Sequence, residues 1–215
     1  MVSIQFNGSH QCGGSIISET KVLTAAHCLH DVSPEDLTLV FGTYLLSKRT
    51  RTSEERKAAS FNVHPKYEPP KVYYDLAIIE VDLPLVFGIS IHPICLPLKP
   101  TDVDSKVSIS VIVAGWGRTD RYSNLSNELR SVSLTVYGQA HCNRSHDWGQ
   151  SIYSYQVKQN MPNLFQSSIM CAASLVILNF IVVHSGLFCH FPAHQKSETW
   201  AASSYIISPL LVDQF

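Results

Sequence analysis

The stretch LTAAHC at residues 23–28, with CGGSII shortly before it at residues 12–17, contains the most informative histidine of the 215-residue chain. His27 stands between small alanines and Cys28, a residue able to form a disulfide. A general base has to titrate near neutral pH and be held in one rotamer and one tautomer. These surroundings favour a catalytic base at His27, although a lone histidine is more often an ordinary surface or core residue.

A second candidate is Asp75, which opens the stretch DLAIIEV at residues 75–81. An aspartate that leads directly into an apolar run is expected to be partly buried, and a buried carboxylate needs partners. Bonding to a histidine N–H would supply one and would fix the imidazole for base catalysis. The alternative is a turn-forming aspartate at the start of a strand, and the local sequence does not decide between the two.

The first two-thirds of the chain read as β-structure. Apolar and polar residues alternate as in half-buried strands in four segments, residues 2–6, 36–41, 107–113 and 131–137. Short strands separated by Pro, Gly, Ser and Asp clusters indicate an all-β barrel or sandwich. An immunoglobulin-like sandwich is disfavoured, because no Trp lies between a Cys pair as that fold prefers.

Two other local features accompany this pattern. The glycines of AGWG at residues 114–117 suit a tight bend with close backbone approach. The charged or Pro- and Asp-rich runs at residues 47–56 and 97–106 predict loops.

The composition narrows the function classes. Hydrophobic residues make up 45% and charged residues 15%, a core-forming composition. Lys plus Arg (16) nearly balances Asp plus Glu (17), so we expect no nucleic-acid partner. The six cysteines form no Cys-x-x-Cys pair, which favours scattered disulfides in an oxidising compartment over a zinc ribbon. Asn-x-Ser triplets at Asn7, Asn124 and Asn143 would accept N-glycan in a secreted protein.

Taken in chain order, these segments closely resemble the trypsin-like serine protease family. The matching pieces are CGGSII at 12–17, LTAAHC at 23–28, DLAIIEV at 75–81, HPICLP at 92–97, AGWG at 114–117, then Cys142 and IMCA at 169–172. Each piece is weak alone, but five in register exclude chance. The resemblance runs over residues 1–173, about four-fifths of the chain, and treats residues 174–215 as an unmatched apolar tail.

The resemblance implies a fold and a set of roles. The fold is all-β, a double six-stranded antiparallel β-barrel whose second barrel is incomplete here. His27 matches the family's general base and Asp75 its orienting carboxylate. Disulfides are implied for Cys12 with Cys28 and for Cys142 with Cys171, and a link from Cys95 to an upstream propeptide or regulatory chain. Protein or peptide substrates or inhibitors are the expected partners, with no cofactor and no metal, so a metal site at residues 27–30 is not expected.

The family's nucleophile motif, Gly-Asp-Ser-Gly-Gly, does not occur in the sequence. Ser185-Gly186 is the one Ser-Gly pair, without the preceding Asp or the second Gly. The motif also supplies the oxyanion N–H groups, and the resemblance begins beyond the family's Ile-Val-Gly-Gly activation terminus. We therefore expect the chain as written to be inactive. A secreted location is expected, although the first residues show no signal peptide.

Three interpretations of the C-terminal part stay open. Residues 159–195 contain no Asp, Glu, Lys or Arg, an abrupt change of composition. The favoured interpretation is a truncated or mis-assembled product of an active protease gene. A second is a non-catalytic homologue that acts as a binding or regulatory protein. A membrane anchor at residues 169–189 is disfavoured, because Asn179 and His184 interrupt the apolar run.

Overall fold

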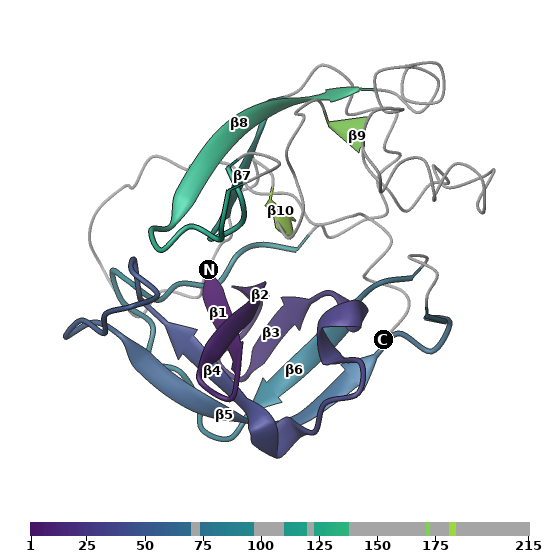
Figure 1. Ribbon diagram of the computed structural model, residues 1–215. Helices are drawn as coiled ribbons and strands as arrows, with labels where there is room; N and C mark the ends of the chain where they lie inside the picture. Colours follow the sequence, from purple (N-terminus) through teal and green to yellow (C-terminus); the bar gives the residue numbers. More distant parts are fainter. Residues whose placement is uncertain (70–73, 97–109, 120–122, 138–170, 173–180, 184–215) are drawn as a thin grey trace.

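The computed structural model describes residues 1–69, 74–96, 110–119, 123–137, 171–172 and 181–183 of the chain (Figure 1). These residues fall into two groups of strands, an N-terminal barrel and a second sheet. Both are antiparallel, and the segment with the catalytic candidates belongs to the first.

Six strands form a closed barrel (Figure 1). They are β1 (Val2–Phe6), β2 (Ser9–Ile16), β3 (Lys21–Thr24), β4 (Leu37–Phe41), β5 (Glu54–Val63) and β6 (Ala77–Val81). Around the barrel the order is β1-β2-β3-β6-β5-β4, and each neighbouring pair is antiparallel. Two short 3₁₀ helices, η1 (Ala26–Leu29) and η2 (Pro34–Asp36), lie between β3 and β4.

The first hairpin shows how local sequence starts the barrel. Asn7 and Gly8 connect β1 to β2 and have φ of 49° and 76°. Positive φ at both central residues is the requirement of a type I′ turn, whose twist matches that of the flanking strands and which favours Asn-Gly. The turn therefore sets the register in which Phe6 pairs with Ser9.

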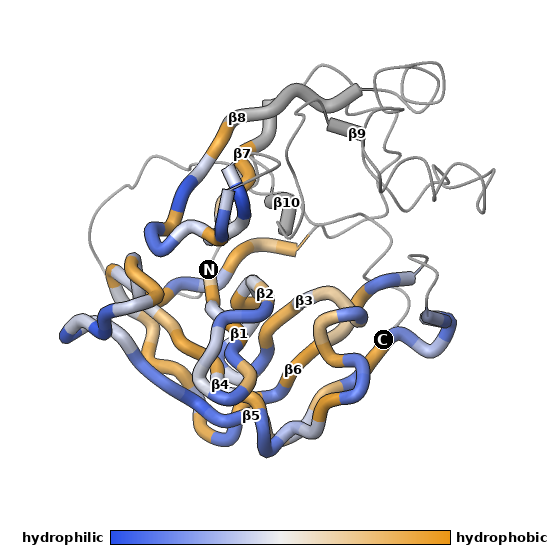
Figure 2. The backbone as a smooth tube through the Cα atoms, in the orientation of Figure 1, coloured by the Kyte–Doolittle hydropathy of each residue, from blue (hydrophilic) through white to orange (hydrophobic). Residues whose placement is uncertain are grey.

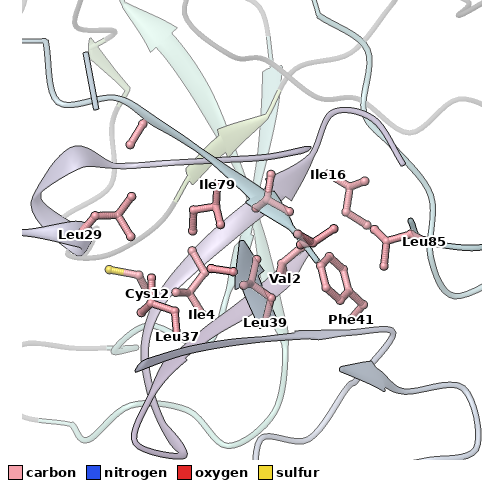
Figure 3. Packing of buried hydrophobic residues seen from close by; sticks show 14 of the residues in the cluster. Val2, Ile4, Cys12, Ile16, Leu29, Leu37, Leu39, Phe41, Ile79 and Leu85 are labelled. Carbon is pink, nitrogen blue, oxygen red and sulfur yellow. The ribbon is translucent and has the colours of Figure 1, made fainter. Parts of the chain in front are cut away.

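Apolar side chains from all six strands fill the barrel. Figure 2 shows hydrophobic residues along the barrel strands, and Figure 3 shows several of the buried side chains packed together. Val2, Ile4, Leu39, Phe41 and Ile79 have no exposed surface. Each fully buried side chain of this size contributes about 1.5–3 kcal/mol relative to exposure. The barrel interior is thus a continuous hydrophobic core. This core fixes the strands whose ends carry the residues at the rim of the barrel.

Strand β1 has the predicted bounds but is buried on both faces. Its polar residues Ser3 and Gln5 are 0% and 3% exposed. Both are hydrogen-bonded: Gln5 Nε2 donates to Ser3 Oγ over 3.2 Å, and Arg49 Nη2 donates to Gln5 Oε1 over 3.1 Å. Buried polar groups persist when they have such partners, so the alternation marks two faces that are both covered.

The second sheet contains four strands among the described residues, in the order β10-β7-β8-β9. They are β7 (Ser110–Gly115), β8 (Arg130–Tyr137), β9 (Cys171–Ala172) and β10 (Ile181–Val183). The all-β class, with a closed first barrel and a second sheet that is partial among the described residues, is as predicted. The proposed boundary at residue 173 stays a prediction; β10, from the segment beyond it, pairs with β7.

The predicted loop over residues 47–56 is wrong at its end, because β5 begins at Glu54. Charged residues made this strand hard to recognise. Arg56 Nη2 donates to Glu54 Oε2 over 2.6 Å, and Arg56 Nε donates to the Leu83 carbonyl over 3.2 Å. Pairing with β4 and β6 closes the barrel and overrides the weak strand preference of these residues. The other predicted loop, residues 97–106, lies outside the described residues.

Candidate active site

His27 is held at the rim of the barrel by a short, cross-linked segment. It lies in η1, directly after β3, where the Cys28 N–H donates to the Ala25 carbonyl over 3.2 Å. The disulfide between Cys12 and Cys28 ties η1 to β2, with 6.2 Å between the two Cα atoms. The predicted pairing of these cysteines is therefore present, and it fixes the residue next to the histidine.

Asp75 reaches the same rim because β3 and β6 are neighbours. Thr24 pairs with Ala77 in this ladder, so the residues after the end of β3 and before the start of β6 lie together. The Leu76 N–H donates to the Tyr74 carbonyl over 2.8 Å, which places Asp75 at the centre of a three-residue turn. The fold thus brings together two residues that are 48 positions apart.

Both carboxylate oxygens of Asp75 bond to His27. Oδ1 accepts from the His27 backbone N–H over 2.8 Å, and Oδ2 lies 2.6 Å from His27 Nδ1. The first contact fixes the carboxylate on the main chain, and the second fixes the ring. A carboxylate accepts, so Nδ1 carries the proton and Nε2 is left to act as a base in the neutral ring. Nε2 lies 3.5 Å from Cys28 Sγ.

The electrostatics follow from this geometry. The side-chain hydrogen bond from Asp75 raises the pKa of His27 above its ordinary value, against the opposing effect of partial burial, and the negative charge of Asp75 adds to the rise. The His27 side chain is 50% exposed and that of Asp75 19% exposed. A half-exposed imidazole with a partly buried carboxylate behind it can exchange protons with an outside reactant and is stabilised when it becomes positively charged.

The remaining predicted cysteines are placed less completely. Cys95 is disulfide-bonded within this chain, and a link to a propeptide would need the same sulfur, so that link stays a prediction. Cys142 lies outside the described residues, and with it the predicted bridge to Cys171 in β9.

A group of potential metal ligands overlaps the site. One ligand atom each from Cys12, His27 and Cys28 lies within 4.8 Å of the others. The two sulfurs are joined in the disulfide and are not thiolates, the form that binds metal. In this oxidised state the cluster belongs to the disulfide-linked segment that carries His27.

Sequence reasoning missed two residues beside Asp75. Tyr74 has φ of 55°, a left-handed backbone that costs a residue with a Cβ about 1–2 kcal/mol. The ring of His64, just after β5, stacks on that of Tyr74 with centroids 4.9 Å apart. The sequence carries no signal for the backbone angle of Tyr74, because an aromatic residue is not a type that indicates positive φ. It carries none for the stacking contact either.

Comparison with known proteins agrees with this arrangement. The family model for Trypsin matches residues 1–182. The chain is 37% identical to granzyme M of Homo sapiens over 153 residues, which cover 71% of this chain and 57% of the relative. It is 34% identical to the serine proteinase stubble of Drosophila melanogaster over 140 residues, 64% of this chain and 17% of the relative. The serine protease snk of the same fly is 35% identical over 132 residues, 61% of this chain and 29% of the relative.

The chain therefore belongs to the trypsin-like serine protease family, as its sequence motifs predicted. It spans between 17% and 57% of the length of these three relatives. Among the described residues, no helix is long and apolar enough to span a membrane.

Proposed function

We propose that this chain carries the histidine–aspartate half of a serine endopeptidase site and does not itself hydrolyse peptide bonds as a 215-residue polypeptide. The observation that carries the first part is the double contact of Asp75 with the backbone N–H and ring of His27, at 2.8 and 2.6 Å. A structural turn aspartate has no need to engage both groups of one histidine.

The roles follow from the chemistry of acyl transfer. A serine hydroxyl that attacks a carbonyl has to lose its proton, and His27 Nε2 would accept it while Asp75 keeps Nδ1–H in place. The raised pKa of His27 has the direction that this step requires, because the carboxylate stabilises the imidazolium. His27 would then return the proton to the leaving amine.

The second part of the proposal rests on the sequence. The 215 residues contain no Gly-Asp-Ser-Gly-Gly motif, and Ser185-Gly186 lacks its flanking residues. Loss of the triad serine alone lowers turnover on the order of a million-fold in subtilisin. The same motif supplies oxyanion N–H donors, so its absence removes much of the remaining rate enhancement as well.

The partners proposed for the site are proteins or peptides, as substrates of a product that carries the serine or as ligands of this one, and inhibitors of the same class. Secretion is proposed on the Cys12–Cys28 disulfide, which persists in oxidising compartments. Exposed Asn7 and Asn124 would accept glycan there. A covalent link through Cys95 to an upstream propeptide, which the family resemblance implies, would require Cys95 to exchange the disulfide that it forms within this chain.

The experiment is labelling of the full, disulfide-intact chain with a fluorophosphonate probe, with a peptide hydrolysis assay in parallel. We expect neither labelling nor turnover. Labelling that disappears in His27→Ala would overturn the proposed inactivity, and Ser185→Ala would then show whether Ser185 is the nucleophile. Sequencing the native transcript from the codon of Cys171 onward tests the origin of the tail: a downstream Gly-Asp-Ser-Gly-Gly frame would assign the nucleophile to another product of the gene.

A further inference from the structure

The backbone on either side of Asp75 is held in an unusual way. Tyr74 has a left-handed backbone with φ of 55°, although only Gly, and less often Asn or Asp, adopt it readily. The turn that follows is closed by the Leu76 N–H on the Tyr74 carbonyl. A bulky residue persists in this conformation when surrounding contacts over-determine it, and such residues gather at functional sites.

Among the described residues, His64 makes two such contacts. Its ring stacks on the Tyr74 ring, with 4.9 Å between centroids and 11° between planes. Its backbone N–H donates to the Leu76 carbonyl over 2.9 Å. His64 therefore contacts the residue before Asp75 through its side chain and the residue after it through its main chain.

The stack is itself fixed. His64 is 3% exposed, and its Nδ1 accepts the backbone N–H of Lys66 over 3.1 Å. Lys66 also places its Nζ 5.4 Å from the centroid of the Tyr74 ring, within cation–π range. The imidazole cannot turn without losing a hydrogen bond, and the tyrosine ring is engaged by two residues of one segment.

We propose that His64 and Tyr74 are positioning residues of the site: they hold the turn around Asp75 so that its carboxylate meets both N–H groups of His27. The inference rests on the proposed role of the His27–Asp75 pair. It requires no contact between His64 and the reacting atoms, since the effect passes through the backbone of residues 74–76.

The geometry explains why the conformation of the turn around Asp75 matters. Asp75 makes two bonds to one residue at 2.8 and 2.6 Å, so a small rotation of its Cα–Cβ bond would lengthen one of them. The φ angle of Tyr74 determines where the following residue begins. Relaxation of Tyr74 to an ordinary negative φ would therefore redirect the carboxylate.

The test is proton and ¹⁵N NMR of the His27 ring in the full chain. The readouts are the low-field Nδ1 proton, which reports the bond to a carboxylate, and the pH midpoint of the ring. Asp75→Asn defines the signal of a lost pair. Tyr74→Gly and His64→Ala each remove one ring of the stack, and both are expected to move the Nδ1 signal toward that of Asp75→Asn and to lower the pKa of His27.

Further variants separate positioning from general destabilisation. Tyr74→Phe and His64→Phe keep the stacked rings and are expected to preserve the signal. Val81→Ala, a core truncation at the far end of β6, is the matched control that lowers stability without moving it. If Tyr74→Gly does not fold, Tyr74→Asn, which tolerates positive φ without the ring, replaces it.

The outcomes are distinct. An unchanged Nδ1 signal and midpoint in folded Tyr74→Gly or Tyr74→Asn and in His64→Ala would overturn the positioning role while leaving the His27–Asp75 pair intact. A signal that Asp75→Asn also fails to change would instead overturn the pair itself, and with it the proposed function.

Discussion

At the scale of single residues, the site depends on how Asp75 uses its two oxygens. One accepts from the main chain of His27 and the other from its ring, so carboxylate and imidazole are oriented relative to one peptide unit. Hydrogen bonds to a charged acceptor are stronger than neutral ones. Competition from water weakens them less when the acceptor is mostly buried. The ring keeps the tautomer that leaves Nε2 as the base.

The first prediction concerns the pH dependence of this pair. Asp75→Asn keeps the shape but removes the charge, and we expect it to lower the pKa of His27 toward the ordinary histidine value. Because the folded-state pKa is raised, the stabilisation from the pair is fully present below the unfolded value of about 6.5 and is lost as pH rises through the folded value.

Urea unfolding of both chains between about pH 5.5 and 9 measures this difference, since it spans the ordinary histidine pKa. The stability advantage of the wild type over Asp75→Asn should shrink as pH rises. His30→Gln, which alters an exposed histidine nearby, should leave that trend in place. An advantage that grows with pH would contradict the prediction.

At the scale of elements, the barrel brings the two catalytic candidates together by pairing β3 with β6, and the disulfide then restrains η1. Cys12 lies in β2 and Cys28 in η1, so the bond crosses from a barrel wall to the histidine segment. A hydrogen-bonded ladder alone would place His27 at the rim without fixing the short helix that carries it.

The second prediction follows from the length of the loop that this bond closes. The cysteines are separated by 16 residues, for which the chain-entropy treatment gives about 3 kcal/mol. The double variant Cys12→Ser, Cys28→Ser should unfold at lower urea concentration by about that free energy. Reductant should shift the wild type in the same direction and have less effect on the double variant. Equal midpoints under oxidising conditions would contradict the prediction.

How far the sequence predicts these elements depends on what stabilises each. Residues 2–6 and 36–41 matched β1 and β4 almost to the residue, because their apolar faces pack on the core. Strand β5 was not recognised, since its charged residues are stabilised by tertiary contacts: Arg56 donates to the Leu83 carbonyl after β6, and Lys57 donates to Thr38 in β4. His27 and Asp75 were identifiable because each stands in a motif. His64 and Tyr74 were not, because their roles depend on a backbone angle and a stacking contact.

At the scale of the whole molecule, Trp116, directly after β7, contacts residues of the N-terminal barrel segment. Trp116 is 1% exposed, its Nε1 donates to the Tyr44 carbonyl over 3.0 Å, and its ring meets that of His10 edge-on at 5.5 Å. Burial lowers the pKa of His10, which favours an uncharged ring against the indole. The AGWG segment, predicted only as a tight bend, thus also supplies a contact between the barrel and the second sheet.

The last prediction tests whether this contact couples the two sheets. Trp116→Phe keeps an aromatic ring but removes the N–H donor and part of the buried volume. The Tyr44 carbonyl still accepts the Leu129 N–H over 2.9 Å, so we expect a moderate loss of about 2 kcal/mol. Hydrogen exchange followed by mass spectrometry should show faster exchange in β7 and β8 than in the wild type, with β3 and β6 unchanged.

The matched control is Tyr44→Phe, which alters a side chain that is 53% exposed while leaving the acceptor carbonyl in place. A surface change of this kind is expected to stay within about 0.5 kcal/mol. If Trp116→Phe accelerates exchange equally in both sheets, the molecule unfolds as one cooperative unit, and the second sheet does not loosen independently of the barrel. If exchange is unchanged in both, Trp116 does not couple them. Selective loosening of β7 and β8 would mean that the first barrel, with His27 and Asp75, keeps its own core when the second sheet is loosened.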